Sequence, residues 1–429
     1  MNYVLLALFL TVIFCFVINL PIGYALGIAT VVCLVVGGDT TQFVIIPQRI
    51  VASMNSFPLL AIIYFMVAGA VMEMGGVSRR IIQLSSSAVG HIKGGLAASS
   101  IISCAIFAAI SGSTPATAAA IGSITIPEMQ KRHYPADYSS AVVASAACLG
   151  VIIPPSITMV IFASTTNTSI GKVLIGGIVP GIFLAILLMI VNYFSSRKAG
   201  YETEVKKSPH EVWLAFKDAF WALLMPIIIL GGIMSGIFTP TESAAIAIFY
   251  GLFVGFFVYK ELKLKDLVPL FYKAALNSAM IMLLIGMAGP FGWLMTTLNV
   301  PTIVSNTLLG ISSNYYVIYA MVLILFLILG TFMETAAIMM LTLPILAPIM
   351  NSIGADMVQF GVVGTVALAI GMATPPVGIS LFATCSVSKV TIGQISSKVW
   401  PFLVVMVFGL FVLMVFPAMS TWLPNLAMG

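Results

Sequence analysis

Two runs of small and hydroxyl-bearing residues lie deep inside apolar sequence, where hydrogen-bonding groups have few partners. The first is Ser111-Gly-Ser-Thr-Pro115, and the second is Gly330-Thr-Phe-Met-Glu-Thr335. Pro115 has no backbone N–H to give to a helix and fits best in the first turn of a new one. We therefore predict one helix that ends near Ser111 and another that begins near Thr114, with the same hairpin repeated at the second run.

Each run is followed by a second interruption. Gly150-Val-Ile-Ile-Pro-Pro-Ser156 follows the first run, and Gly371-Met-Ala-Thr-Pro-Pro-Val377 follows the second. Proline inside a helix removes a hydrogen bond and clashes with the preceding turn, so each Pro-Pro pair predicts a broken helix. Matched interruptions in the two halves of an apolar chain are typical of transporter binding sites.

Breaks of this kind leave backbone groups free to bind ions. Carbonyls at a helix C-terminus and N–H groups at an N-terminus lack helical partners, and in hydrocarbon they persist only where protein, water or ligand satisfies them. Carbonyls 150–153 with the hydroxyls of Ser111 and Ser113 form one predicted oxygen cage for a small hard cation, and residues 330–333 with 371–374 form another. Helix N-termini, which suit a carboxylate, are predicted near Thr114, Ser156, Thr335 and Val377. The predicted substrate-binding residues are Thr114, Ser156, Glu334, Thr335 and Pro376.

Each of these features also has a purely structural interpretation. Ser and Thr in membrane helices often donate to a carbonyl one turn back or join neighbouring helices. Glu334, at the second hairpin tip, is a candidate to ligate an ion, bind protons, contact a partner or make a structural hydrogen bond. Glu242, in Thr239-Pro-Thr-Glu242, is predicted to cap its helix. The repetition of hairpin and break in both halves favours a functional interpretation of the pair.

The composition places the chain in a membrane. Of its 429 residues, 61% are hydrophobic and 7% are charged, whereas soluble domains carry about 25% charged residues. Apolar runs of about 20 residues, the length that crosses a bilayer, recur along the chain. The sequence contains no nucleotide-binding loop and no zinc-protease or serine-hydrolase motif, which argues against an enzyme and against an ATP-driven pump.

The predicted fold is an all-α polytopic membrane protein with two inverted repeats, each holding a re-entrant helical hairpin and a Pro-Pro-broken helix. Residues 1–196 form the first repeat, with scaffold spans in 1–93, hairpin and broken helix in 94–168, and a span over 173–196. Residues 197–218 form a polar cytoplasmic linker. Residues 219–429 form the second repeat, with scaffold spans in 219–314, hairpin and broken helix in 315–388, and a last span over 399–422.

The distribution of positive charge predicts the orientation. If Arg79 and Arg80 are cytoplasmic, all of the 18 Lys and Arg except Arg49 and Lys172 fall on the cytoplasmic side. Because Lys and Arg in short loops stay on that side, this arrangement places both termini outside and makes the two hairpins enter from opposite faces. The net charge of +5 is then explained by topology rather than by an anionic partner such as nucleic acid.

Several motifs together resemble one family. The run Gly236-Ile-Phe-Thr-Pro-Thr-Glu-Ser-Ala-Ala245, the first hairpin tip and the two Pro-Pro breaks are similar to the large membrane subunit of TRAP transporters, the tripartite ATP-independent periplasmic transporters. The resemblance covers nearly the whole chain. It implies a bacterial inner-membrane protein that imports organic acids with sodium by an elevator motion. It also implies two partners, a separate small four-helix membrane subunit and a periplasmic substrate-binding protein.

The resemblance further implies two or more coupling sodium ions. It places one sodium site at Ser111, Ser113, Gly150 and Ile153 and the other at Gly330, Met333, Gly371 and Thr374. The likeness is closest to the sialic-acid-specific members, although selection in this family falls largely to the soluble binding protein. The membrane chain alone indicates a small, polar substrate with a carboxylate.

Two other hypotheses compete with this one. In the first hypothesis, the chain is a self-sufficient cation-coupled dicarboxylate carrier that needs no partner. In the second it is a membrane scaffold or an intramembrane hydrolase that uses Ser113 or Glu334. Uptake by the purified chain alone favours the first, and labelling by serine-reactive probes favours the second.

Overall fold

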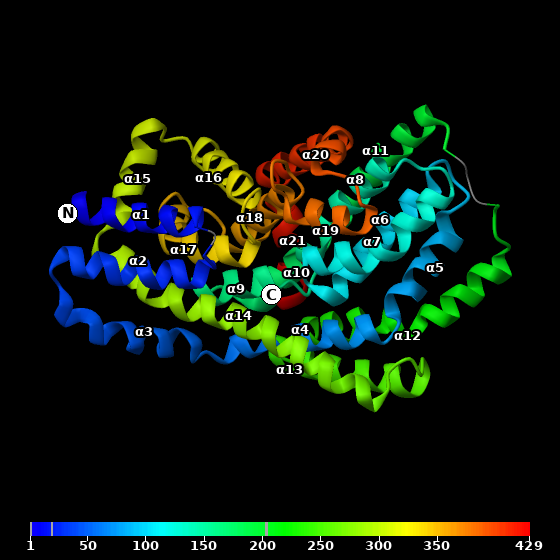
Figure 1. Cartoon of the computed structure of the whole chain (residues 1–429), viewed down its shortest axis with the longest axis horizontal. Helices are drawn as coiled ribbons and strands as arrows, with labels where there is room; N and C mark the ends of the chain where they lie inside the picture. The colour runs from blue at the N-terminus through cyan, green and yellow to red at the C-terminus, as the bar shows by residue number, and fades with distance from the viewer. Residues whose placement is uncertain (1, 19, 202–204) are drawn as a thin grey trace.

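The computed structural model describes residues 2–18, 20–201 and 205–429, and helices make up nearly all of them (Figure 1). No β-strand occurs in these ranges. Within the described residues, seven helices have the length and apolar composition to cross a membrane: Phe57–Met74, Ile170–Ala199, Pro209–Met234, Pro240–Val258, Leu264–Thr297, Thr335–Ser352 and Ile392–Val415. The expected all-α polytopic fold is therefore confirmed.

The first hairpin and the first broken helix form where the sequence predicts them. The hairpin consists of α6 (Gly95–Ser111) and α7 (Thr114–Lys131), and α6 ends because Gly112 adopts a left-handed conformation with φ +62°. The broken helix consists of α8 (Ala136–Ala147), the short 3-10 helix η3 (Cys148–Val151) and α9 (Ile157–Thr166). Its break contains the cis peptide bond Pro154–Pro155.

The second copy repeats this arrangement with different residues. The hairpin consists of α16 (Tyr315–Gly330) and α17 (Thr335–Ser352), and the broken helix consists of α18 (Met357–Met372) and α19 (Ile379–Ser388). The second tip has no proline after its turn, and Glu334 caps α17 instead. The break again contains a cis bond, Pro375–Pro376.

The two hairpins approach the middle of the molecule from opposite ends. Figure 1 shows α6 and α7 on one side and α16 and α17 on the other. α7 packs against α19, and α17 packs against α9. Each hairpin therefore lies on the second half of the other copy's broken helix, and the two copies form one interlocked unit.

Two of the surrounding helices include polar sequence. α1 (Asn2–Val17) and α2 (Ile22–Gly37) are followed by α3 (Ile45–Met54), which precedes α4 (Leu60–Met74). α14 (Leu264–Thr297) begins in a basic segment and continues as an apolar span. Contacts with helices far away in the chain, α3 on α14 and α14 on α2, explain why polar residues remain helical there.

The helix ends also differ from the predicted boundaries. α11 (Ile178–Ala199), which follows α10 (Ile170–Gly176), and α12 (Pro209–Met234) both extend into the predicted linker 197–218. Ser208 and Glu211 form a capping box that starts α12 inside it, and residues 202–204 lie outside the described residues. The last span begins earlier than predicted, as α20 (Ile392–Val415), and Pro417 separates it from α21 (Ala418–Met428).

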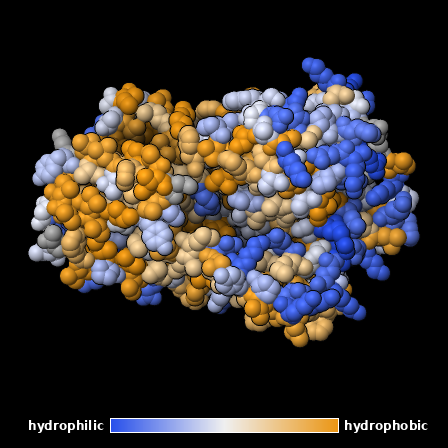
Figure 2. Space-filling model, in the orientation of Figure 1, coloured by the Kyte–Doolittle hydropathy of each residue, from blue (hydrophilic) through white to orange (hydrophobic). Residues whose placement is uncertain are grey.

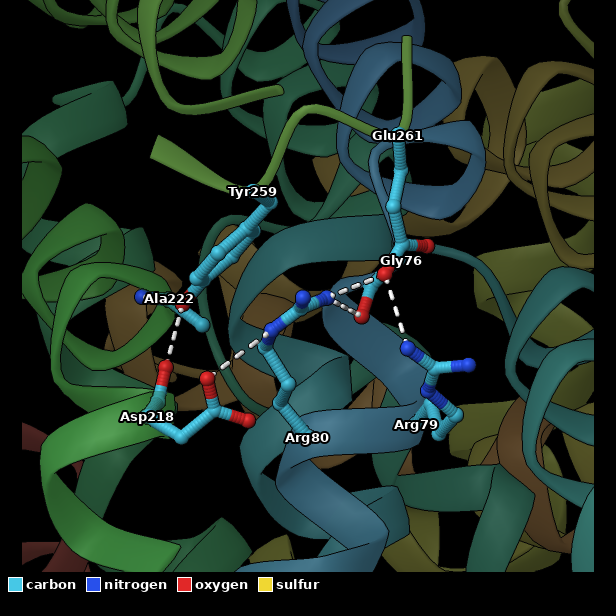
Figure 3. Close-up of polar contacts among 7 residues, drawn as sticks. All are labelled: Gly76, Arg79, Arg80, Asp218, Ala222, Tyr259 and Glu261. Atoms are coloured by element: carbon cyan, nitrogen blue, oxygen red, sulfur yellow. Dashed lines mark hydrogen bonds and ion pairs between the residues drawn. The ribbon is translucent and has the colours of Figure 1, made fainter. Parts of the chain in front are cut away.

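An ion-pair cluster around the buried Arg80 joins α5 (Val77–Val89) to the helices beside it. Arg80 lies 3.4 Å from Asp218 of α12 and 2.8 Å from Glu261, and its guanidinium carbon lies 3.7 Å from the centre of the Tyr259 ring (Figure 3). Burial raises the pKa of Tyr259 to about 12, so its hydroxyl stays protonated and donates to the Asp218 carbonyl at 2.9 Å.

This cluster lies beyond α13 (Pro240–Phe253) and its terminal π-turn (Val254–Val258). Figure 2 shows that hydrophilic residues gather over this end of the molecule, where α5 and the start of α12 lie. Glu242, near the other end of α13, forms a capping box with Thr239, as predicted. The remaining helix, α15 (Val300–Ile311), connects α14 to the second hairpin.

Candidate functional site

Hydroxyl groups close the tip of the first hairpin. Ser111 Oγ lies 2.7 Å from Thr117 Oγ1, and the Thr117 hydroxyl also reaches the Ser113 carbonyl oxygen at 2.9 Å. Both hydroxyl side chains are buried. Thr117 stands one turn into α7, where its side chain points back over the hairpin tip. Three oxygens from two helices therefore converge within hydrogen-bonding distance of one another.

The first break packs directly against this tip. A methyl group on Gly150 would lie 2.6 Å from the Ser113 carbonyl oxygen and 2.7 Å from Thr117 Oγ1, so only glycine fits. Beyond the break, the Ile157 N–H points to the Gly112 carbonyl at 3.5 Å. Ser111, Ser113 and Gly150, three residues of the first predicted oxygen cage, therefore lie close together.

Two further predicted residues at this end differ in their bonding. Ser156 caps α9, because its hydroxyl accepts from the Met159 N–H at 3.3 Å and donates to the Val151 carbonyl at 2.6 Å. Thr114 is fully buried, and its hydroxyl has no hydrogen-bond partner among the described residues. An orphaned buried hydroxyl is costly. Its oxygen at the N-terminus of α7 is therefore available to a ligand.

The second tip is closed by backbone contact rather than by side chains. A methyl on Gly371 would lie 2.7 Å from the Gly330 Cα atom, so α16 and α18 touch at these two glycines. The Gly378 N–H donates to the Thr331 carbonyl at 2.9 Å, in the position that Ile157 and Gly112 occupy in the first copy. Thr374, half-buried beside them, donates from its hydroxyl to the Ile370 carbonyl at 2.7 Å.

Thr335 and Glu334 lie at the start of α17. The buried Thr335 hydroxyl lies 2.7 Å from that of Thr158, so the second hairpin tip is bonded to the first turn of α9. The Glu334 side chain accepts from the Ala336 N–H at 3.2 Å and caps its own helix, while the residue is exposed on the surface of the chain. Of the four roles considered for Glu334, this geometry matches the structural hydrogen bond.

Three of the predicted site residues do not join these groups by any contact that the described residues show. The Ile153 side chain packs against Gly181 of α11. Met333 bonds back to Leu329 through its N–H at 3.1 Å, and Pro376 is exposed. Thr117 and Thr158 were not among the predicted site residues. Thr117 lies four residues after Ser113, about one helical turn away, and this spacing was the available signal. Thr158 meets the second tip only because α9 packs on α17.

The chemistry of these tips suits a small hard cation. The converging groups are hydroxyl and carbonyl oxygens, which hard cations prefer. Within the described parts of the chain, no cluster of three His, Cys, Asp or Glu side chains has the geometry to hold a metal. The oxygens that converge at the first tip therefore carry no formal negative charge.

A cavity of about 540 Å³ opens beside α9 and α17, beyond the first turn of α17. One wall comes from α3 and α14 and includes Arg49, Ser53 and Trp293. The opposite wall comes from α9 and α17 and includes Thr165 and Met340. The cavity thus lies between the surrounding helices and the interlocked hairpins, and it is large enough for a small organic molecule.

The protein has two helical hairpins with oxygen-lined tips, and each tip packs on a broken helix. In a multi-span helical protein this arrangement defines a membrane transporter. The fold is similar to that in the crystal structure of the YdaH transporter of Alcanivorax borkumensis, described there as having an unusual topology. The two share a TM-score of 0.63 and 13% identity over 86% of this chain and 87% of that one. This likeness concerns the fold alone.

The family follows from sequence comparison. Residues 9–419 match the family described as "Tripartite ATP-independent periplasmic transporter, DctM component". The chain belongs to this family, as its motifs predicted, and is therefore a large permease subunit of TRAP type in the bacterial inner membrane.

Its relatives carry different substrate names. The chain is 43% identical to the isethionate TRAP transporter permease protein DctMQ of Oleidesulfovibrio alaskensis, over 94% of this chain and 63% of that protein. It is 40% identical to the C4-dicarboxylate TRAP transporter large permease protein DctM of Pseudomonas aeruginosa, over 86% of each. It is 34% identical to the sialic acid TRAP transporter large permease protein SiaM of Vibrio cholerae, over 96% of each.

Proposed function

We propose that this chain is the membrane subunit of a sodium-coupled importer of small organic anions. The observation that carries the proposal is the pair of hairpin tips, each packed on a Pro-Pro break and lined by hydroxyl and carbonyl oxygens. Ser111, Thr117 and the Ser113 carbonyl would hold one sodium ion. The carbonyls around Gly330, Gly371 and Thr374 would hold the other. The bound ions are cargo, and their charge offsets that of the anion.

The proposed transport step is an elevator motion. The interlocked hairpins and broken helices would move as one body against a scaffold that includes α3, α4, α13 and α14. The cavity supports this division, because its two walls belong to the two proposed bodies. Substrate bound between the tips and the cavity would be exposed first to one side of the membrane and then to the other.

The orientation and the partners belong to the same proposal. Basic residues gather at the end that holds Arg79 and Arg80, which supports a cytoplasmic location for this end and a periplasmic location for both termini. We further propose a periplasmic binding protein and a separate small four-helix membrane subunit. Relatives of matching length carry the name "large permease protein", which supports a separate small subunit.

The substrate proposed is a small carboxylate or sulfonate. Isethionate and C4-dicarboxylates have the support of relatives at 43% and 40% identity. Sialic acid, which the motif resemblance favours, has the support of a relative at 34% identity. All three compounds are anions of a size that a 540 Å³ cavity accommodates.

Uptake into proteoliposomes tests the proposal. Vesicles would hold this chain with or without a small membrane subunit and a binding protein, under an inward sodium gradient or an equal potassium gradient. The substrates would be radiolabelled isethionate, succinate and sialic acid. We expect uptake of at least one anion that requires sodium and both partners. Uptake by the chain alone would instead establish the self-sufficient carrier, and uptake in potassium would refute sodium coupling.

A further inference from the structure

We propose that Arg49 supplies the positive charge that recognises the anionic group of the substrate, inside the cavity between α3, α14, α9 and α17. The inference rests on the proposed function, because it takes an organic anion as the cargo. It adds a recognition residue that lies outside the hairpins and breaks. The ligand class is a carboxylate or a sulfonate, whose paired oxygens match the fork of a guanidinium group.

Arg49 is a cation without a partner. It is the only charged residue among the described residues that line the cavity. Its guanidinium makes no ion pair and no hydrogen bond within the described parts of the chain, whereas Arg80 is paired with both Asp218 and Glu261. A guanidinium remains charged at any physiological pH. The cavity therefore carries one uncompensated positive charge.

Close helix packing places Arg49 at the cavity wall. α3 lies on α14 where side chains have no room, since a methyl on Gly289 would collide with Ser53 Oγ and would lie 2.9 Å from the Arg49 carbonyl oxygen. Ser53 in turn donates to that carbonyl at 2.7 Å. Arg49 and Ser53 are four residues apart and occupy one face of α3. Both line the cavity.

The rest of the lining suits an organic anion with further polar groups. Ser56 and Thr296 on the wall of Arg49, and Ser164 on the opposite wall, bring hydroxyl groups. Trp293, Leu59 and Ile161 supply apolar surface between them. Arg49 is itself exposed, so its guanidinium is accessible to a ligand that enters the cavity. A carboxylate or sulfonate would therefore bind at the guanidinium with its remaining atoms toward the hydroxyls.

The two walls give Arg49 a role that depends on conformation. Arg49 belongs to the proposed scaffold, while Ser164 and Met340 belong to the proposed moving body. When that body moves, the guanidinium stays behind. The substrate is then paired with Arg49 only in the conformation in which α9 and α17 face α3. Affinity for the anion is accordingly higher in this conformation than in the one reached after the movement.

Cysteine protection tests the site without requiring transport. Ala52 lines the cavity and is exposed, so Ala52→Cys in a Cys385→Ser background would be alkylated with an uncharged maleimide in the purified protein. We expect isethionate or succinate to slow alkylation, uncharged mannitol to have no effect, and Arg49→Gln to abolish the protection. Arg197→Gln, which removes an exposed charge from the end of α11, is the matched control. Protection that survives Arg49→Gln, or no protection by either anion, overturns the proposal.

Uptake measurements separate this inference from the proposed function. In the complete system, Arg49→Gln should reduce anion uptake by about tenfold, the effect of losing a charge-assisted pair, with the half-activating sodium concentration unchanged. Arg49→Lys should retain part of the uptake, because it keeps the charge and loses the fork. A wild-type protein that shows protection without uptake would refute the proposed function and support the anion site. Full uptake by Arg49→Gln would refute the anion site alone.

Discussion

The two hairpin tips occupy equivalent places in the two halves but are closed by different groups. In the first, the Ser111 and Thr117 hydroxyls and the Ser113 carbonyl form a network with distances of 2.7 and 2.9 Å. In the second, Gly330 and Gly371 meet backbone to backbone, and a hydrogen bond of 2.9 Å joins Gly378 to Thr331. Side-chain hydroxyls thus stabilise the first hairpin tip. The second tip is stabilised by close backbone contact, which its glycines permit because they have no side chain.

This difference determines which substitutions each tip tolerates. Oxygen ligands at the first tip come partly from side chains, so a conservative change can remove one oxygen and leave the backbone in place. At the second tip the oxygens are mainly carbonyls, whose positions depend on close helix contact. We therefore expect the first tip to be sensitive to hydroxyl removal and the second to added volume.

The largest effects are expected from added volume at the two break glycines. A methyl on Gly371 meets only backbone within 3 Å, at Gly330 and Leu327, whereas a methyl on Gly150 meets the Ser113 carbonyl and the Thr117 side chain. Gly371→Ala and Gly150→Ala should each destabilise the fold by about 1–3 kcal/mol and abolish uptake, with Gly371→Ala the worse. Thermal unfolding and uptake measure both effects.

Gly393→Ala is the control, because no atom lies within 4 Å of the added methyl. It should leave stability and uptake intact. If Gly150→Ala proves the more damaging of the pair, the first tip depends on close packing more than the second, and the comparison is reversed.

Hydroxyl removal at the first tip should have the next largest effect. Thr117→Val keeps the shape of the side chain but leaves Ser111 and the Ser113 carbonyl without their common partner. We expect the half-activating sodium concentration to rise about tenfold and the stability to fall by about 1–2 kcal/mol. The measurement is uptake against external sodium.

Thr125→Val provides the comparison within the same helix. Its buried hydroxyl only donates to the Ile121 carbonyl one turn back, at 2.9 Å. The Thr125→Val variant should lose some stability without a change in the half-activating sodium concentration. Equal sodium dependence in the two variants would remove Thr117 from the sodium site.

Thr374→Ala should weaken sodium activation less than Thr117→Val does. The Thr374 hydroxyl makes a single bond, to the Ile370 carbonyl, and the residue is half-buried. We expect a rise of about threefold in the half-activating sodium concentration, since carbonyls dominate the second tip. Thr365→Ala, inside α18 with an equivalent bond to the Gly361 carbonyl, should leave sodium activation unchanged. A larger effect at Thr374 than at Thr117 would contradict the proposed difference between the tips.

Glycine and proline account for the part of the fold that the sequence predicted. Gly112 and Pro115 set the ends of α6 and α7, and the two Pro-Pro pairs mark the breaks, because these residues act on the backbone locally. The polar residues of α3 and the start of α14 gave no such signal. Their helices are stabilised by packing on partners far away in the chain, which local patterns do not report.

The candidate site was predictable to the same degree. Ser111 and Ser113 lie in one hairpin tip, so the hairpin alone brings them together, and Gly150 marks the break that packs on this tip. Thr158 and Arg49 depend on how separate helices meet. Arg49 in particular was predicted only to lie outside the cytoplasmic side, because the packing of α3 on α14 that places it in the cavity depends on the glycines of a helix far away in the sequence.

The smallest effect is expected at Glu334, where the two tips differ in charge. Its carboxylate accepts the Ala336 N–H at 3.2 Å, and Gln keeps that acceptor. Glu334→Gln should therefore change stability by less than about 0.5 kcal/mol and leave uptake intact, while Glu334→Ala should cost about 1 kcal/mol as a lost helix cap. Thermal unfolding with uptake in the same preparations tests both. Loss of uptake in Glu334→Gln with unchanged stability would mean that the negative charge itself is used, so that the second tip differs from the first in chemistry as well as in packing.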